Sequence, residues 1–167
     1  IEIKRHWKIF VKTVKRLQEQ HNNLSFVLLE GDNVNINSGV DIIKVKENQY
    51  EAIGVADAAI VCSGTATLET AMLKCPMIVC YKLSYLTWIV AQALSKVKYL
   101  SLANLIAEDR VVDEYLQGKM TAKNLSNGIN NLLKDENRDI VMEKYNKLID
   151  KLKSNENPYS SAARYIY

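Results

Sequence analysis

Hydrophobic residues recur at helical spacing through the first twenty positions of the chain. Residues three or four positions apart share one side of a helix, so this spacing is typical of a helix that packs on a core along one face. The hydrophobic positions are Ile3, Trp7, Phe10, Val11, Val14 and Leu17, and the basic positions on the opposite face are Arg5, Lys8, Lys12 and Lys15. The pattern predicts an amphipathic helix over residues 2–20.

After this helix, short apolar runs alternate with longer segments of helical periodicity. Short apolar runs bounded by polar residues are typical of strands, and the periodic segments are typical of helices. The predicted strands are residues 24–29, 42–45, 58–62 and 77–81, and the predicted helices are residues 47–55, 65–74, 83–100, 121–133 and 139–152. This alternation favours an α/β fold, with a Rossmann-like parallel sheet flanked by helices.

The segment ADAAIVCSGTATLE, residues 56–69, predicts a buried strand, a tight turn and a helix. The turn is Ser63, Gly64 and Thr65, where glycine allows close backbone approach or a positive φ and Ser63 or Thr65 can cap the helix. The unpaired amides of the helix start can bind an anion. Glu69 follows about one and a half turns into the helix, where its carboxylate can accept hydrogen bonds from a ribose diol. An ordinary strand-to-helix turn has the same pattern, so both interpretations remain open.

Ligands of open parallel sheets bind at the carboxyl ends of the strands. Applied to the predicted strands, this rule selects Gly31, Lys46, residues 63–65, Tyr81 and Lys82. The rule therefore gives a second reason, independent of the turn pattern, to expect a ligand at residues 63–65.

Residues 83–100 form an unusually apolar connection that contains Tyr85, Trp88 and Tyr99. Such a segment is either part of the core or a surface for a lipid or a partner. We expect that part of its aromatic face, especially Tyr85 and Trp88, is exposed, with plain core as the competing interpretation.

Composition and charge narrow the class of protein. A chain of 167 residues with 48% hydrophobic residues fits one domain with a core, and a net charge of +3 is too small to favour nucleic acid as a partner. Basic residues gather at 4–8, 12–16 and 144–153, which are solvated helix faces or attract an anionic membrane surface. No apolar run is long enough to span a membrane, and no signal peptide is visible. Because no initiator methionine is present, we expect one lobe of a larger protein.

Three cysteines, Cys62, Cys75 and Cys80, lie in apolar or small-residue surroundings without the spacing of a metal site. We interpret them as buried thiols of a reducing compartment. A catalytic cysteine needs a histidine partner, and the only histidines are His6 and His21, on or beside the first helix. A catalytic cysteine is therefore disfavoured.

A longer run carries a resemblance to a known family. It reads ADAAIVCSGTATLETAMLKCPMIVCYKLSYLTWIVAQALSKVKYLSLANLIAEDRVVDEYLQ and closely resembles the C-terminal half of lipid-A-disaccharide synthase, a family of two-lobed inverting glycosyltransferases. The similarity extends over residues 3–133, and SGTATLE, KCPMIV, the Tyr81-Lys82 pair and SLANL occur in the family's order. The resemblance implies one Rossmann-like lobe of a GT-B type enzyme, the lobe that binds the nucleotide-sugar donor.

The implied donor is UDP-2,3-diacylglucosamine and the implied acceptor is 2,3-diacylglucosamine 1-phosphate, with release of UDP. Ser63, Gly64 and Thr65 match the family's phosphate turn, and Glu69 matches the carboxylate at the ribose. The backbone at Val45, Lys46 and Glu47 lies where related enzymes dock the uracil, and Tyr81 and Lys82 are further donor-site residues. No metal or other cofactor is implied, because amide dipoles and side chains would stabilise the departing diphosphate.

Asn104 in SLANL matches an asparagine of the family's SLPNL motif that is implicated in activity. Ala103 stands where the family has proline, which puts the rigidity of this loop in doubt. Glu114 and Gln117 match the conserved end of the family's next helix, near the donor. Asn104 is the one catalytic candidate in this chain.

The resemblance also implies parts that lie outside these residues. A Gly-Ser-Arg turn would precede Ile1, and the acceptor lobe with its acidic catalytic residues would lie further upstream. We expect residues 1–133 to form the UDP-binding lobe and residues 134–167 to pack on the other lobe or on a partner. The implied partners are the two lipid substrates, the N-terminal lobe, a second copy in a homodimer and the cytoplasmic face of the inner membrane. This chain alone is expected to be inactive.

Two alternatives belong to other classes. The first is another two-lobed enzyme that uses a UDP-sugar, such as an epimerase or a different glycosyltransferase, which would share residues 63–69 but lack SLANL. The second is a catalytically silent nucleotide-binding or interaction domain. A classical dinucleotide-binding enzyme is disfavoured because no Gly-x-Gly-x-x-Gly follows the first predicted strand.

Overall fold

The computed structural model describes residues 2–29, 39–62, 64–82 and 98–153. Helix α1, Glu2–Gln20, has the bounds that its periodicity predicts. It packs against helix α6, Ala122–Leu132. On the packed side of α1, His6, Thr13 and Leu17 are buried, and the hydroxyl of Thr13 donates back to the carbonyl of Ile9 at 2.9 Å. The amphipathic pattern thus brings the first helix onto the core.

In the ranges that the structure describes, five short parallel strands form two sheets. Strands β1, Val27–Leu29, and β2, Ile43–Val45, pair with each other. Strands β3, Ala59–Cys62, β4, Met77–Tyr81, and β5, Asp113–Leu116, form the second sheet in that order. The α/β fold with parallel strands flanked by helices is confirmed.

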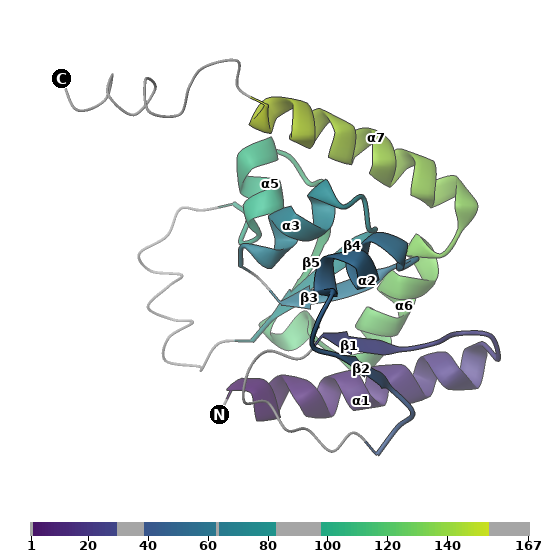
Figure 1. Ribbon diagram of the computed structural model, residues 1–167. Coiled ribbons are helices and arrows are strands. Elements are labelled where there is room, and N and C mark those ends of the chain that lie inside the picture. Colours follow the sequence, from purple (N-terminus) through teal and green to yellow (C-terminus); the bar gives the residue numbers. More distant parts are fainter. Residues whose placement is uncertain (1, 30–38, 63, 83–97, 154–167) are drawn as a thin grey trace.

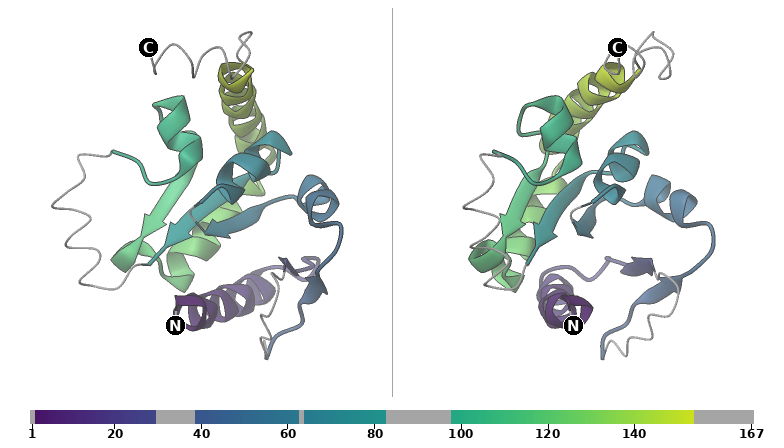
Figure 2. Two further views of the ribbon diagram at one scale, coloured as in Figure 1. Left: turned by 60° about the vertical axis from the view of Figure 1, so that its left-hand side comes forward. Right: turned by 90° about the vertical axis from the view of Figure 1, so that its left-hand side faces the viewer.

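In the part of the chain that the structure describes, the parallel strands are divided between two sheets. Figure 2 shows the β1–β2 pair set apart from the β3–β4–β5 sheet. Both strands of the pair are three residues long and neither has a fully buried residue.

Helices cover both faces of the three-stranded sheet (Figure 1). Met77 and Val79 of β4 face the core cluster that includes helices α3, Ala66–Met72, α5, Leu102–Ala107, and α7, Asp135–Leu152. Ile78 and Cys80 face the opposite cluster, with α1 and α6. A strand covered on both faces is apolar at successive positions, which explains the unbroken MIVCY run.

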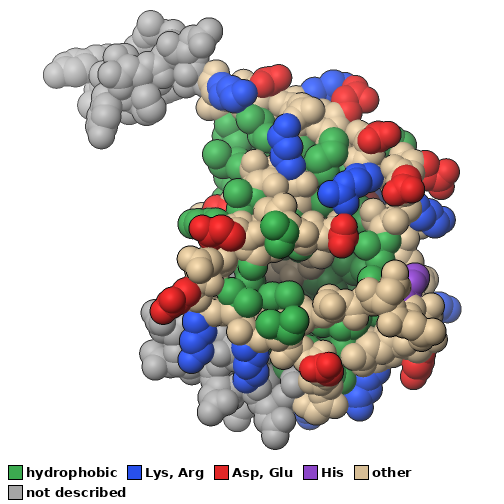
Figure 3. All heavy atoms as spheres, turned by 45° about the vertical axis from the view of Figure 1, so that its right-hand side comes forward, with side chains coloured by type: hydrophobic (Ala, Val, Ile, Leu, Met, Phe, Trp, Pro, Cys, Tyr) green, Lys and Arg blue, Asp and Glu red, His purple; other side chains and the backbone are tan. Residues whose placement is uncertain are grey.

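The remaining surface includes exposed apolar side chains near the β1–β2 pair. Val27 and Ile43 on the strands and Tyr50 and Val55 on helix α2, Gln49–Val55, are all more than half exposed. Figure 3 shows hydrophobic side chains around a hollow on one face of the molecule. Among the helices of the described ranges, none combines the length and the apolarity needed to cross a membrane.

Helix α7 packs on this same domain. Tyr145 is fully buried and its hydroxyl accepts a hydrogen bond from the Met77 amide at 3.1 Å, while burial raises the pKa of its phenol. Leu148 joins the same cluster. The helix begins four residues before the predicted start at 139. The division at residue 133 stays a prediction, since residues 154–167 lie outside the described chain and no partner is present.

Gly128 lets helix α6 approach the sheet. A Cβ at this position would lie 2.8 Å from the Tyr115 hydroxyl and 3.1 Å from Ile78 Cγ2. We expect Gly128→Ala to lower the free energy of unfolding by about 1–3 kcal/mol in urea titrations. Gly54→Ala is the matched control, because its Cβ would meet nothing within 4 Å in helix α2. Equal effects of the two substitutions would contradict this packing argument.

Candidate functional site

The carboxyl ends of three neighbouring strands meet at one edge of the central sheet. Cys62 of β3 is in register with Cys80 of β4, and Tyr81 of β4 is in register with Leu116 of β5. The residues that follow these strands therefore lie side by side: the turn before Thr65, then Lys82, then Gln117. Three segments that are distant in sequence are brought to the edge where parallel sheets bind ligands.

The turn between β3 and α3 has the backbone that the sequence predicts at Gly64. Its φ of +147° lies in a region that L side chains rarely adopt, and a Cβ there would meet no atom within 4 Å. Gly64 and Thr65 are exposed, so a ligand can approach the backbone closely. Ser63 lies outside the described residues.

Helix α3 begins with amides that face no described acceptor. The Thr67 amide and hydroxyl both bond the Gly64 carbonyl, at 3.2 and 2.8 Å. Thr65 occupies the N-cap position but makes no side-chain cap bond, which differs from the predicted capping role. Within the described residues the Thr65 and Ala66 amides donate to no acceptor, so they remain available as donors for a ligand.

Glu69 lies in α3, one turn after Thr65, and its amide donates to the Thr65 carbonyl at 3.2 Å. Its side chain is half-buried. The carboxylate makes no hydrogen bond or ion pair with the part of the chain that the structure describes. A half-buried carboxylate without an internal partner has its acceptor capacity free for a ligand.

His6 reaches the strand edge from helix α1. Its Nε2 lies 3.2 Å from both the amide and the carbonyl of Lys82, and its Nδ1 lies 3.9 Å from Cys62 Sγ. Its ring contacts that of Tyr81 edge-on, with centroids 5.6 Å apart. Sequence reasoning missed this position of His6, because 56 and 76 residues separate it from Cys62 and Lys82.

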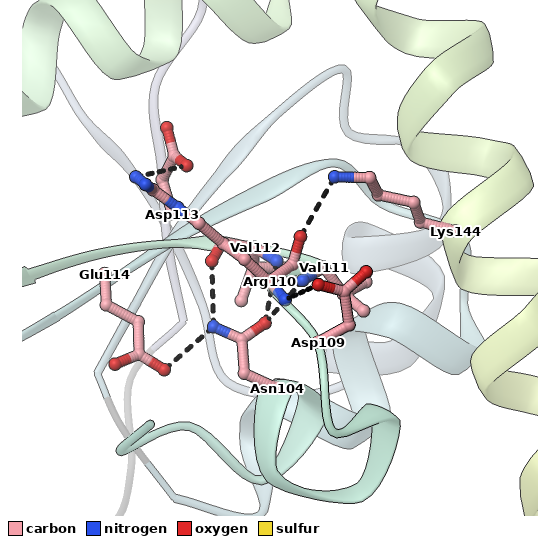
Figure 4. A network of polar contacts seen from close by, with 8 residues as sticks. All are labelled: Asn104, Asp109, Arg110, Val111, Val112, Asp113, Glu114 and Lys144. Carbon is pink, nitrogen blue, oxygen red and sulfur yellow. Dashed lines mark hydrogen bonds and ion pairs between the residues drawn. The ribbon is translucent and has the colours of Figure 1, made fainter. Parts of the chain in front are cut away.

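Asn104 has all its hydrogen-bonding positions occupied (Figure 4). Its carbonyl oxygen accepts from the amides of Val111 and Val112 at 2.8 and 2.9 Å. Its Nδ2 donates to the Val112 carbonyl and to Glu114 Oε1, both at 2.9 Å. The side chain is fully buried in α5. These hydrogen bonds hold the loop that leads into β5, so Asn104 has the geometry of a residue that positions other parts of the site.

Glu114 closes the other side of this network. Its Oε1 accepts from the amide and the hydroxyl of Ser101, at 2.9 and 2.8 Å, as well as from Asn104. Its Oε2 accepts from the Leu100 amide at 3.0 Å. Ser101 in turn caps α5 by accepting from the Asn104 amide at 3.3 Å. Glu114 therefore fixes the start of α5, and hydrogen bonds from the protein's own groups occupy both of its carboxylate oxygens.

Contacts on the exposed side of the domain also hold the loop between α5 and β5. Lys144 of α7 donates to the Arg110 carbonyl at 2.9 Å, and Arg110 pairs with Asp113 at 2.8 Å on the exposed side. These contacts and the Asn104 bonds act on the same few residues (Figure 4). The loop therefore enters β5 at a fixed position.

The other predicted site residues are distributed over two regions. Gln117 directly follows β5 at the strand edge, with a left-handed φ of 49°. Val45 ends β2, and Lys46 and Glu47 follow it with exposed side chains. Because β2 belongs to the other sheet, strand pairing does not bring these three residues to the edge of β3, β4 and β5.

One expectation about the cysteines is wrong. Cys75 and Cys80 are buried as predicted, but Cys62 is exposed. It is the last residue of β3, where the chain turns away from the covered part of the sheet. Among the described residues, no group of three or more His, Cys, Asp or Glu side chains could hold a metal ion.

Known proteins with similar sequences agree with the resemblance. A family model described as lipid-A-disaccharide synthetase matches residues 1–166. A lipid-A-disaccharide synthase 1 of Legionella pneumophila is 37% identical over an alignment of 145 residues that covers 82% of this chain and 38% of that protein. A lipid-A-disaccharide synthase of Rickettsia prowazekii is 32% identical over an alignment of 176 residues that covers 99% of this chain and 46% of that protein. The chain thus spans less than half the length of these relatives, and it belongs to the lipid-A-disaccharide synthetase family.

Proposed function

We propose that this chain is the donor-binding lobe of a glycosyltransferase of lipid A biosynthesis. The transferred group would be 2,3-diacylglucosamine, moved from its UDP derivative to 2,3-diacylglucosamine 1-phosphate with inversion and release of UDP. The observation that carries the proposal is the family match over residues 1–166. The meeting of the β3, β4 and β5 ends beside a glycine turn supports it, because α/β sheets bind nucleotides at such an edge.

In this proposal the exposed turn at Ser63, Gly64 and Thr65 binds the diphosphate. The free amides at Thr65 and Ala66 are the donors, and the phosphate charge favours them over a neutral ligand. Glu69, one turn further, accepts hydrogen bonds from the ribose diol. Tyr81, Lys82 and Gln117 border the same edge, and the backbone at Val45, Lys46 and Glu47 receives the uracil.

We assign Asn104 and Glu114 to positioning. Both side chains are occupied by internal hydrogen bonds, so in this structure neither has a free atom to offer a substrate. Their effect on activity would pass through β5, whose end carries Gln117 to the strand edge. In this proposal Asn104 acts on the reaction by holding this loop, in place of the catalytic role that we expected from the sequence.

The remaining parts of the reaction are assigned to residues outside this chain. An inverting transfer needs a base for the attacking hydroxyl. Of the described groups at the edge, His6 is buried and bound to Lys82, and Glu69 is assigned to the ribose. We propose that the N-terminal lobe supplies the base, so that this lobe alone is inactive. We also propose contact with the cytoplasmic face of the inner membrane, because both substrates carry acyl chains, and we propose a homodimer.

The role of Glu69 gives the test of this proposal. Glu69→Ala should weaken UDP binding by about 1.5–3 kcal/mol, roughly 10- to 150-fold in Kd, if the carboxylate bonds the diol. Titration calorimetry of the unaltered chain and of the variant, each with UDP and with 2′,3′-dideoxy-UDP, tests the carboxylate and the ribose diol separately. The variant should lose its preference between the two ligands.

Glu143→Ala is the control, because Glu143 pairs with Lys147 on the exposed face of α7. It should bind UDP as the unaltered chain does. If the unaltered chain binds the dideoxy nucleotide as tightly as UDP, Glu69 does not bind the ribose.

A further inference from the structure

Cys62 lies in a cluster of three titratable side chains from three different elements. Cys80 of β4 is its register partner on the neighbouring strand, and His6 of α1 lies 3.9 Å from its sulfur through Nδ1. Cys80 and His6 are buried, with exposed fractions of 0% and 5%, whereas Cys62 is exposed. Cys62, the one exposed thiol, therefore lies against the buried side chains of Cys80 and His6.

The hydrogen bonds of His6 orient its ring toward the thiol. When Nε2 accepts from the Lys82 amide at 3.2 Å, the proton must lie on Nδ1, which faces Cys62. When both nitrogens are protonated, Nε2 donates to the Lys82 carbonyl, also at 3.2 Å, and Nδ1 still donates toward the sulfur. Both arrangements place a donor beside the Cys62 thiolate. In the remaining tautomer Nε2 donates to the Lys82 carbonyl and Nδ1 accepts from the Cys62 thiol, so that the imidazole is a base held in place by a third group.

The electrostatics agree with this geometry. The neighbouring Cys80 thiol lowers the pKa of Cys62, partial burial raises it, and His6 lowers it further, to about 6 in total. The groups that act on Cys62 thus come from β4 and α1. The neighbouring Cys62 and burial raise the pKa of Cys80, which therefore stays a thiol. Burial raises the pKa of Cys75 to about 11, so that residue is an internal reference for an unreactive thiol.

We propose that Cys62 is a reactive thiol that forms a mixed disulfide with small disulfides at the edge of the central sheet. The Cys62 thiolate attacks one sulfur of a disulfide such as oxidised glutathione. A new sulfur–sulfur bond forms as the old one breaks, and the departing thiolate takes a proton from water. The modified side chain directly precedes the turn at residues 63–65, so modification adds bulk where that turn begins.

The chemistry sets the expected signature. At pH 6 a thiol with a pKa of about 6 is half ionised, whereas an ordinary thiol with a pKa of about 8.5 is ionised to about 0.3%. The lower basicity reduces intrinsic nucleophilicity by about tenfold, so a net advantage of about tenfold remains at pH 6. The distinctive result is therefore the pH at which the rate of thiol modification is half-maximal, near pH 6. A high rate at neutral pH is less distinctive.

The experiment follows iodoacetamide labelling of the reduced, folded chain from pH 5 to 9 by intact mass, with peptide mapping at early times. We expect one fast site, mapped to Cys62, with a rate midpoint near pH 6. Cys80→Ala and His6→Gln should each move the midpoint upward, while Cys75→Ala should not. Oxidised glutathione should add one adduct at Cys62 that dithiothreitol removes.

A midpoint near pH 8.5, or early label found at Cys75 or Cys80 in place of Cys62, would overturn the proposal. Mapping the unaltered chain decides this even where a variant fails to fold. No nucleotide is needed, so the result does not depend on whether the chain binds UDP.

Discussion

Replacing Asn104 with alanine should lower the free energy of unfolding by about 3–5 kcal/mol. The substitution removes four hydrogen bonds at once. The buried Val112 amide would lose its acceptor, and the buried Val111 amide would keep only its bond to the Asp109 carbonyl at 3.1 Å. A buried donor without a partner is more destabilising than the loss of an exposed bond. Urea unfolding followed by circular dichroism measures the change.

Asn137→Ala provides the matched substitution. Asn137 donates a single exposed hydrogen bond, at 2.8 Å, to the Asn131 carbonyl. Its replacement should change stability by less than about 1 kcal/mol. Similar losses for the two asparagines would show that the Asn104 network does not hold the loop into β5.

Glu114→Gln should be the next most damaging substitution, with a loss of about 2–3 kcal/mol. The carboxylate accepts on both oxygens, from Leu100 on one side and from Ser101 and Asn104 on the other. The glutamine side chain has the same shape but only one oxygen acceptor, and its other atom is an NH₂ donor. The donors on one side of it would therefore face another donor. Urea unfolding of the single and double variants with Asn104→Ala gives the coupling between the two residues.

We expect the double variant to lose less than the sum of the single losses, by about 1–2 kcal/mol, because the two side chains share one hydrogen bond. Glu143→Gln, on the exposed face of α7, is the control and should change stability little. Fully additive losses would mean that Asn104 and Glu114 act independently.

Local periodicity was enough to predict the elements that are strongly patterned or fully covered. Helix α1 has the predicted bounds, and β4 coincides with its apolar run. Gly64 was predicted to need an unusual backbone, and its φ confirms this. These features depend on short-range chemistry, which the sequence displays directly.

Tertiary contacts account for what the sequence could not show. Asn104 bonds backbone groups at 111 and 112, and any residue type can supply those, so no sequence signal marks them. His6 meets Cys62 only because α1 packs beside the ends of β3 and β4. Which strands pair with which depends on long-range contacts such as the register of β3, β4 and β5, and these are not written in the pattern of any one strand.

Titration of the chain with UDP, UMP and inorganic phosphate, by calorimetry and by amide chemical shifts in NMR, tests the donor-site assignment most directly. We predict that UDP binds at least ~10-fold more tightly than either of the other two, an advantage of about 1.4 kcal/mol. The affinity should be weak overall, because the other half of the binding cleft is supplied elsewhere. The largest shifts should fall at Gly64, Thr65 and Glu69. Equal affinities for UDP and phosphate, or no shifts at these residues, would contradict the assignment of this lobe to the nucleotide-sugar donor.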